Sequence, residues 1–322
     1  MSLIVLAPGL QTTVQDLGRV GFRHLGVAVG GVLDPFALQA GNALLGNRCD
    51  AAALEYALVG PTLRVGRELL VVPMGTAPAR LDGVPVPCER PLRLVPGQLL
   101  QLGTMRQGAR GWLCVAGGIE VPAVLGSRST DLGAGFGGFE GRALRAGDVL
   151  PTGAPSHAAA ALLQELSLQQ RVGARWGLAA SGDADRPVRV LPHADRDLRD
   201  FCAEAWTVSP DSNRMGLRLC GARMQVEAQD AQLSAGVGPG SIQLPAGGQP
   251  IVLLADAQTI GGYPLLGAVI RADWPRLAQA RPGSLLRFSV VSLAEAEAAF
   301  SRQQVELARL SIAAAARLAA YS

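Results

Sequence analysis

GSIQLPAGGQPIVLLADAQTIGGYP, residues 240–264, places a short apolar strand between two groups of polar side chains. Residues 251–255 form an apolar run bounded by turn residues, which predicts a buried strand. Gly261 and Gly262 then allow a tight backbone path. The polar residues around the strand are Gln243, Gln249, Asp256, Gln258, Thr259 and Tyr263. Because an amide side chain offers both a donor and an acceptor, this group suits recognition of an amide, lactam or ureide, although the same residues also serve to close turns.

The composition indicates a β-rich globular protein. The chain has 322 residues, of which 49% are hydrophobic and 17% are charged, a size that favours about two domains. Its 40 glycines and 21 prolines are scattered, which predicts many turns between short strands. No apolar run reaches the length of a membrane span, and the first residues lack a basic signal-peptide start. We therefore expect a cytoplasmic protein that does not enter the membrane.

All 29 basic residues are arginine, and the chain contains no lysine. A GC-rich coding sequence explains this bias, but its chemical consequences hold in any case. A Walker-type P-loop, a Schiff-base lysine and covalent biotin on a lysine of this chain are excluded. The net charge of +3 is small and evenly spread, so we expect no nucleic-acid partner. The cysteines and histidines are isolated from one another, so we expect no disulfide framework and no metal.

Local signals divide the chain into strands and a few helices. A helix is predicted between Asp34 and Gly46. Asp34 is a good N-cap, Pro35 suits the first helical position, and Gly46 suits the residue that ends the helix. Further helices are expected at residues 158–170 and 194–205, and Ser292 and Glu295 form a capping box before a C-terminal helix. That helix carries one apolar stripe: Phe300, Leu307, Leu310, Ala314 and Leu318. Residues 11–31 show few strand signals and should form an ordered loop. Short strands are expected at residues 62–65, 69–72, 79–81, 92–94, 99–102, 111–116 and within 285–291.

Two further patterns bear on organisation. Gly133, Gly135 and Gly138 form a G-x-G-x-x-G pattern that does not lie between a strand and a helix. It therefore predicts a flexible loop that can close over a ligand, not a dinucleotide fingerprint. Pro-Gly-Gln-Leu-Leu at residues 96–100 is echoed by Pro-Gly-Ser-Leu-Leu at 282–286. This echo suggests two related β-barrels, with domains at residues 1–185 and 186–322.

Five motifs occur in one order, at residues 8–22, 30–47, 115–131, 209–219 and 240–264. Together they resemble the biotin-dependent carboxyltransferase family, also called allophanate hydrolase subunit 2, whose stand-alone bacterial members include KipA-type proteins. The resemblance covers residues 3–290. It implies a mainly β fold of two cyclophilin-like β-barrel domains, with a few short helices and a C-terminal helix. Departures from the family pattern are small: Gly41 stands where alanine is common, and Leu217 replaces a frequent tyrosine.

The resemblance also implies an activity and partners. We expect a hydrolase, one component of an ATP-dependent 5-oxoprolinase that converts 5-oxoproline to glutamate. Its partners would be a KipI-like subunit and a LamB/YcsF-like subunit, without which the chain should be inactive. ATP would be held here or by a partner. One alternative is a carboxyltransferase acting from carboxybiotin on urea or a similar amide. Another is a non-enzymatic, KipA-like regulator of a histidine kinase inhibitor.

The polar motifs supply the candidate site residues, and we expect one functional cleft between segments 11–19, 127–131, 213–214 and 243–263. Activation of a lactam by phosphate develops negative charge, which the planar fork of arginine suits. The catalytic candidates are Arg128, Arg214, Asp256 and Gln258. The substrate-binding candidates are Gln15, Asp16, Arg19, Ser127, Ser129, Thr130, Asn213, Gln243, Gln249, Thr259 and Tyr263. For the arginines at 19, 128 and 214, structural ion pairs with Asp16, Asp131 and Asp211 are an equally good interpretation.

Overall fold

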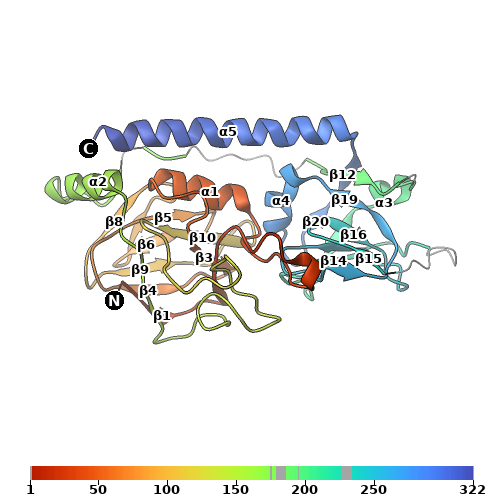
Figure 1. Cartoon of the computed structure of the whole chain (residues 1–322), viewed down its shortest axis with the longest axis horizontal. Helices are drawn as coiled ribbons and strands as arrows, with labels where there is room; N and C mark the ends of the chain where they lie inside the picture. Colours follow the sequence, from red (N-terminus) through yellow and green to blue (C-terminus); the bar gives the residue numbers. More distant parts are fainter. Residues whose placement is uncertain (1, 175, 179–185, 195, 226–233, 322) are drawn as a thin grey trace. The chain divides into compact units, whose positions relative to one another are not determined.

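The structure, a computed structural model, describes residues 2–174, 176–178, 186–194, 196–225 and 234–321. It is mainly β, with several sheets, short helices and a long C-terminal helix (Figure 1). This confirms the predicted mainly β class. The chain forms two compact units: the first contains residues 1–18, 34–181 and 306–322, and the second contains residues 19–33 and 182–305. The predicted domain boundary after residue 185 stays a prediction.

The first unit contains two antiparallel sheets. One has the order β11-β1-β4-β9-β6-β7 and the other β2-β3-β10-β5-β8. The strands are β1 (Leu3–Ala7), β2 (Gln11–Gln15), β3 (Ala53–Ala57), β4 (Thr62–Val65), β5 (Leu69–Met74), β6 (Ala79–Leu81), β7 (Val84–Val86), β8 (Leu92–Leu94), β9 (Leu99–Leu102), β10 (Arg110–Val115) and β11 (Val149–Leu150). Six of them match the strands expected between residues 62 and 116, because alternating or continuous apolar runs between turn residues are strong strand signals.

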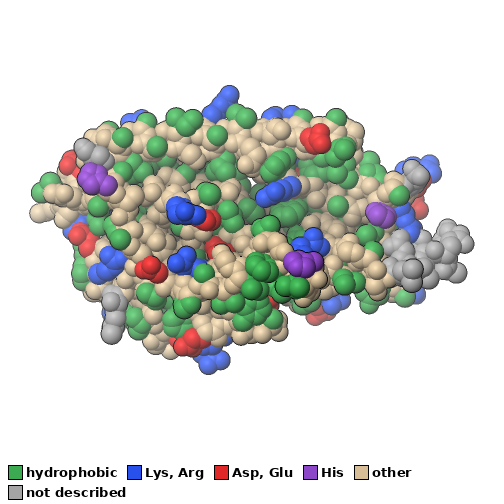
Figure 2. All heavy atoms as spheres, in the orientation of Figure 1, with side chains coloured by type: hydrophobic (Ala, Val, Ile, Leu, Met, Phe, Trp, Pro, Cys, Tyr) green, Lys and Arg blue, Asp and Glu red, His purple; other side chains and the backbone are tan. Residues whose placement is uncertain are grey.

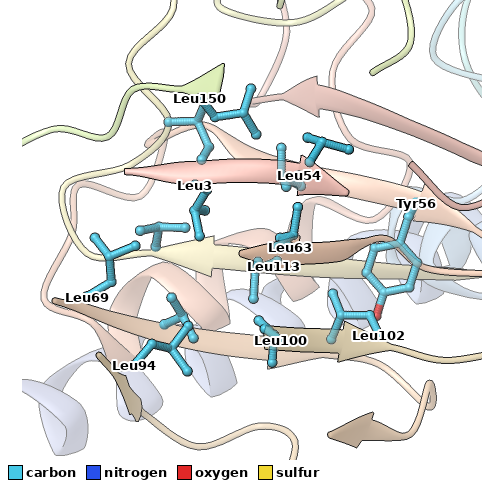
Figure 3. Packing of buried hydrophobic residues seen from close by; sticks show 14 of the residues in the cluster. Leu3, Leu54, Tyr56, Leu63, Leu69, Leu94, Leu100, Leu102, Leu113 and Leu150 are labelled. Carbon is cyan, nitrogen blue, oxygen red and sulfur yellow. The ribbon is translucent and has the colours of Figure 1, made fainter. Parts of the chain in front are cut away.

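The core of the first unit lies between these sheets. Leu3, Leu63 and Leu100 come from the six-stranded sheet, and Leu54 and Leu113 come from the five-stranded one (Figure 3). All five are fully buried. Burial of each such side chain contributes about 1.5–3 kcal/mol. The sheets therefore form a rigid support for the loops that leave their ends.

Two short helices lie within this unit, which also contains the last part of the long C-terminal helix. The ends of the two short helices agree with the sequence signals. In α1 (Pro35–Leu44), the Asp34 carboxylate accepts a hydrogen bond from Ala37 N at 2.9 Å, which confirms the predicted N-cap. Gly46 has a φ of +62°, the left-handed conformation that ends helices. In α2 (His157–Leu168), Ser156 caps the first turn. The helix was predicted at residues 158–170, so it starts one residue earlier and ends two residues earlier than expected.

An eight-stranded sheet dominates the second unit, in the order β20-β13-β14-β17-β16-β19-β12-β21. Its two end strands, β20 and β21, are separated along the chain by Arg287 alone, so the sheet curls into a nearly closed barrel. A two-stranded ribbon pairs β15 with β18. The strands are β12 (Val188–Pro192), β13 (Trp206–Val208), β14 (Gly216–Cys220), β15 (Ala235–Gly236), β16 (Ser241–Gln243), β17 (Ile251–Leu253), β18 (Ile260–Gly261), β19 (Leu265–Val269), β20 (Leu285–Leu286) and β21 (Phe288–Val290).

Aromatic packing fills the barrel of the second unit. The ring of Phe201 lies 4.6 Å from that of Phe288 and 5.5 Å from that of Trp206. Trp206 is fully buried and its indole N–H donates to the carbonyl of Phe201 at 2.9 Å. The cluster thus gains ring–ring packing without leaving a buried donor unpaired. The short helical segments of this unit are η1 (Arg23–Leu25), α3 (Arg199–Ala203), which supplies Phe201, η3 (Arg271–Asp273) and α4 (Trp274–Ala278).

The C-terminal helix α5 (Leu293–Ala319) begins at the predicted capping box. Ser292 and Glu295 exchange backbone-to-side-chain hydrogen bonds of 2.8 and 3.3 Å. The predicted apolar stripe is confirmed, because its residues are buried or half-buried, Ala314 and Leu318 most of all. None of the helices within the described residues combines the length and apolar character needed to cross a bilayer.

Two expectations from the sequence were wrong. Residues 11–15 form strand β2, which pairs with β3 along its whole length, although they were expected to belong to a loop. The β-branched residues Thr12, Thr13 and Val14 favour a strand, a signal that the expectation of a loop overlooked because the segment is polar and followed by glycines. The helix expected at residues 194–205 is only the five-residue α3, because β13 starts at Trp206, whose indole is buried in the barrel. Residue 195 lies outside the described residues.

Candidate functional site

In the first unit, the carboxylate of Asp16 binds donors from a segment 111 residues away. The hydroxyls of Ser127 and Ser129 donate to its Oδ1 at 2.6 and 2.5 Å. The backbone N–H groups of Arg128 and Gly18 donate to the same carboxylate at 2.5 and 2.8 Å. We call these residues the Asp16 network. Its hydrogen bonds hold the end of β2 to residues 127–129 and leave the carboxylate well satisfied.

Gln15 and Thr130 extend the Asp16 network into the core. The Gln15 amide donates to Thr13 Oγ1 at 3.0 Å and to the Thr130 carbonyl at 3.1 Å. The Thr130 hydroxyl donates to the Val14 carbonyl at 3.0 Å. Gln15 is fully buried, and its Oε1 has no hydrogen-bond partner among the described residues. The side-chain oxygen of Gln15 is therefore still able to accept a hydrogen bond.

The remaining polar residues of this region support turns. Arg128 Nε donates to the Val121 carbonyl at 2.8 Å. Asp131 Oδ1 accepts from the N–H groups of Gly133 and Ala134, each at 3.0 Å. The glycine-rich segment that follows was predicted to be a loop, and it is one. Gly138 must be glycine, because a Cβ there would lie 1.8 Å from Thr130 Oγ1.

This glycine-rich loop lines a largely apolar cavity of about 400 Å³ in the first unit. Its other wall comes from the turn that carries Val121. The lining residues are Glu120, Val121, Pro122, Val124, Gly135, Phe136, Gly137, Gly138, Phe139, Glu140, Gly141 and Pro151. Few polar atoms face it, and none of the predicted site residues lines it.

In the second unit, Arg214 and Asp256 form a two-point ion pair. Nε and Nη2 of the guanidinium donate to Oδ2 and Oδ1 of the carboxylate at 2.8 and 2.9 Å. Both side chains are almost completely buried. Nη2 also donates to the carbonyl of Gly31 at 2.5 Å, and Gly30 N donates to the Ala255 carbonyl at 3.0 Å. The structural ion pair considered for Arg214 therefore exists, with Asp256 in place of Asp211.

The ion pair holds a loop against the barrel. We call residues 19–33 the η1 loop, after the short helical turn within it. Arg19, a predicted site residue, is buried in this loop, and its backbone N–H donates to the Val29 carbonyl at 2.8 Å. Arg23 reaches the Val237 carbonyl through its guanidinium. The loop is thus fixed at Val237, Ala255 and Arg214.

Two glutamine amides meet next to this loop. Gln258 Nε2 lies 3.4 Å from Gln243 Oε1, a long hydrogen bond. Gln243 is buried, and its Nε2 has no hydrogen-bond partner among the described residues. A Cβ at Gly261 would lie 2.2 Å from that nitrogen. The pair therefore presents one free amide donor, beside a glycine that leaves space for it.

The other predicted residues of the second unit are placed differently. Thr259 is buried and Tyr263 is exposed, and both follow β17 as Gln258 does. Asn213 Oδ1 accepts from Met215 N at 2.8 Å and caps the turn before β14. Gln249 lies at the opposite end of β17 from Gln258, where its amide binds both backbone groups of Gly221. Gln249 is therefore separated from the glutamine pair.

The structure brings Asp16, Ser127 and Ser129 together in the first unit and Gln243 and Gln258 together in the second, whereas all of them were expected from the sequence to lie in one cleft, which stays a prediction. Sequence reasoning missed the roles of Gly31, which accepts from Arg214, and of Gly261, which borders Gln243. A sequence signal for both roles was present, because each glycine belongs to a Gly-Gly pair within a polar motif: Gly30-Gly31 and Gly261-Gly262. Within the described residues, no group of three or more histidine, cysteine or carboxylate side chains is arranged to hold a metal ion.

Comparison with known proteins identifies relatives over almost the whole chain. Residues 25–290 match the model of the carboxyltransferase domain, subdomains A and B. The chain is 40% identical to the C subunit of 5-oxoprolinase from Escherichia coli (strain K12), over 94% of this chain and 95% of that protein. It is 39% identical to the C subunit of 5-oxoprolinase from Haemophilus influenzae, over 89% and 90% of the two chains.

A solved structure shows the same fold in a longer protein. The Kluyveromyces lactis urea carboxylase superposes with a TM-score of 0.82 at 27% identity. The match covers 96% of this chain but only 29% of the urea carboxylase chain. The lower identity makes this a more distant relative than the 5-oxoprolinase subunits. The chain therefore belongs to the family of carboxyltransferase domains with subdomains A and B, and it is a homologue of the 5-oxoprolinase C subunit.

Proposed function

We propose that this chain is the C subunit of an ATP-dependent 5-oxoprolinase, which opens the lactam ring of 5-oxoproline to give glutamate. The observation that carries the proposal is the 40% identity to a 5-oxoprolinase C subunit along 94% of this chain and 95% of the relative. Its partners would be a KipI-like subunit and a LamB/YcsF-like subunit. The two units would be cyclophilin-like barrels, an assignment that the nearly closed sheet of the second unit supports.

The glutamine pair is our proposed substrate contact. A lactam presents one carbonyl acceptor and one N–H donor, and a glutamine amide presents the complementary donor and acceptor. The free Nε2 of buried Gln243 supports a contact with the lactam carbonyl, and Gln258 would take the second position. Thr259 and Tyr263 follow on the same segment and would border the substrate.

The arginine and aspartate candidates suit different roles. Asp256 has both oxygens engaged by Arg214, so we assign this pair to positioning the η1 loop and the segment after β17. A lysine-free chain has no Walker-type P-loop, so we place the ATP site on a partner and assign no step of its chemistry to residues of this chain.

Carboxyl transfer to urea or a similar amide is the second candidate function. The family model and the urea carboxylase fold favour it. The identities favour 5-oxoproline, because the 5-oxoprolinase subunits match at 40% and 39%, whereas the urea carboxylase structure matches at 27%. Both substrates contain an amide group, so the same glutamine pair would serve either reaction.

The test is reconstitution of the three subunits with 5-oxoproline and ATP, followed by glutamate formation. The complex with the wild-type chain should turn over, and Gln258→Ala should lower kcat/KM about 10- to 100-fold, since losing a substrate hydrogen bond in a covered site costs about 1–3 kcal/mol. Gln249→Ala is the matched control, because this glutamine lies at the other end of β17; it should keep normal turnover.

Melting temperatures of both variants separate function from folding. Gln258 is exposed, so its truncation should leave the melting temperature of the isolated chain nearly unchanged. Normal turnover by Gln258→Ala would remove this residue from the site. A wild-type complex that ignores 5-oxoproline but carboxylates urea would replace the proposed reaction with the second candidate.

A further inference from the structure

The cavity beside the glycine-rich loop of the first unit has no part in the proposed function. Its volume of about 400 Å³ falls within the range of small-molecule sites, about 300–1,000 Å³. None of the candidate site residues lines it. Figure 2 shows hydrophobic side chains at the surface in the region of this loop. A space of this size and character suits a small organic molecule.

The wall of the cavity is built from backbone conformations that cost free energy. Gly141 has a φ of +68°, and a Cβ there would lie 2.1 Å from the carbonyl oxygen of Gly135. Glu140 has a left-handed φ of +56° although it carries a side chain, and Leu125, next to the lining residue Val124, has a φ of +52°. Strained backbone of this kind concentrates at binding sites. The loop is therefore more elaborate than a connection between β10 and β11 requires.

The interior of the cavity is apolar. Phe136 and Phe139 line one side and are half-buried, and Val121 and Val124 line the other. Phe139 also packs against the core of the first unit, and the guanidinium of Arg142 lies 5.3 Å from the centre of its ring. Its ring is thus held between the core and Arg142. An apolar ligand would gain by displacing water from these walls, and an aromatic ligand could also pack on the rings.

Charge at the mouth of the cavity decides which ligands it accepts. Glu120 and Glu140 both line the cavity and are exposed, so they stand at its mouth. Arg142 neutralises Glu140 through hydrogen bonds of 3.1 and 2.6 Å to its Oε2. No basic residue is present among the described residues that line the cavity. Glu120 therefore supplies a negative charge that the lining does not compensate, which attracts a cation and repels an anion.

We propose that this cavity is a binding site for a small apolar amine, with its hydrocarbon body against the phenylalanine and valine side chains and its protonated amino group at Glu120. The same features disfavour the molecules of the proposed reaction, because 5-oxoproline, glutamate and ATP are anions. The site shares no residue with the glutamine pair. Its existence therefore does not depend on which reaction the assembled enzyme catalyses.

The wall of the cavity continues into the Asp16 network. Val124 and Ser127 exchange backbone hydrogen bonds of 2.8 and 3.2 Å, and the Ser127 hydroxyl donates to Asp16. Arg128 Nε donates to the Val121 carbonyl at 2.8 Å. A ligand that contacts Val121 and Val124 therefore stabilises the segment that binds Asp16. Slower amide hydrogen exchange in residues 120–129 would report this.

The experiment measures binding of three indole compounds to the full chain by calorimetry. Tryptamine carries an ammonium group, tryptophol a neutral hydroxyl and indole-3-acetate a carboxylate on the same ring. Tryptamine should bind with a Kd of about 0.1–1 mM, as expected of a ligand with few atoms. Tryptophol should bind about 2- to 5-fold more weakly, since an exposed ion pair contributes little, and indole-3-acetate should be the weakest. Tryptamine should also slow amide exchange in residues 120–129.

Two variants separate the charge from the cavity. Glu120→Gln should make tryptamine and tryptophol bind alike. Its matched control is Glu306→Gln, because Glu306 is exposed in the same unit and does not line the cavity. Val124→Trp should fill the cavity and weaken binding of tryptamine about 10-fold or more. Its control is Val84→Trp in β7, where the side chain is 63% exposed and outside the cavity.

Three results would overturn the site. The first is a wild-type chain that does not bind tryptamine. The second is a ratio of the tryptamine and tryptophol Kd values that is the same in Glu120→Gln as in the wild type. The third is unchanged tryptamine binding by a Val124→Trp chain that melts as the wild type does. If Val124→Trp melts early, the Kd ratio of Glu120→Gln and the amide exchange of residues 120–129 decide.

Discussion

At the residue scale, Gly261 controls the position of the Gln243 amide. A Cβ at this position would lie 2.2 Å from Gln243 Nε2, and the nearest other atoms are 3.3 Å away. The amide is the end of a flexible side chain, so Gly261→Ala should move it at little cost in stability. We expect kcat/KM of the reconstituted enzyme to fall about 10-fold, with the melting temperature nearly unchanged.

Gly236 offers a control for Gly261, because it lies in the same two-stranded ribbon and its added Cβ would meet no atom within 4 Å. Gly236→Ala should therefore keep full turnover. Equal activity of Gly261→Ala and wild type would show that the amide position of Gln243 does not matter for the reaction.

Individual polar residues show what the sequence can and cannot predict. Gln243 and Gln258 both stand in the polar motif around the strand predicted at residues 251–255, and the structure places their amides 3.4 Å apart. The partner of Arg214 does not follow from its neighbours: Asp211 is three residues away, but Asp256 accepts both hydrogen bonds. The sequence alone does not distinguish the two carboxylates, and the tertiary fold decides which of them lies next to Arg214. The same holds for Asp16, which binds three donors from the distant residues 127–129 besides Gly18 N.

At the element scale, the N-cap of α1 contains a titratable group. Asp34 is 6% exposed, and burial raises its pKa from 3.8 to about 6, although the N–H of Ala37 opposes this shift. The folded state therefore keeps the proton between these pH values, where the unfolded state has released it. The free energy of unfolding should fall as pH rises through that window, by an amount on the order of 2–3 kcal/mol.

Asp34→Asn should remove this pH dependence, because asparagine caps helices well and carries no charge. Chemical denaturation at several pH values between 4 and 7.5 measures the difference between variant and wild type. That difference should be small at the acidic end and favour the variant at neutral pH. Asp50→Asn is the control, since a hydrogen bond from Arg48 lowers the pKa of exposed Asp50, so that its effect on the free energy of unfolding should hardly change between pH 5 and 7.5. A difference for Asp34→Asn that does not change with pH would contradict the prediction.

Elements with strong local signals were predicted well, and those that depend on partners were not. Helix α1 combines a cap, an N-terminal proline and a stop glycine, all of which act within a few residues. Strand β2 has a weaker signal, since only Thr12, Thr13 and Val14 favour a strand and its pairing with β3 extends over the whole segment. Helix α3 is short for the opposite reason: Trp206 enters the barrel and takes the chain into β13.

At the scale of the whole molecule, the order of five motifs predicted the family better than any composition or periodicity did. Periodicity shows that strands exist, but it does not show that β20 and β21 lie at the two ends of one eight-stranded, nearly closed sheet. The sheet is nearly closed because its two end strands follow each other along the chain, with only Arg287 between them. The polar motifs predicted one cleft formed by four segments, and the structure shows local hydrogen-bonded groups of these residues within each unit; the shared cleft stays a prediction.

The absence of lysine provides the last prediction, because it separates the two candidate reactions. This chain has no lysine to carry biotin, so carboxyl transfer would require biotin on a separate carrier protein. Avidin binds the biotin of such a carrier and should stop carboxyl transfer. It should leave ATP-dependent glutamate formation by the reconstituted subunits unchanged, because opening the lactam by water uses no carboxyl group. The measurement is the initial rate of glutamate formation with and without excess avidin, using biotin-saturated avidin as the control. Inhibition by free avidin alone would show that a biotin carrier takes part and would favour carboxyl transfer over hydrolysis.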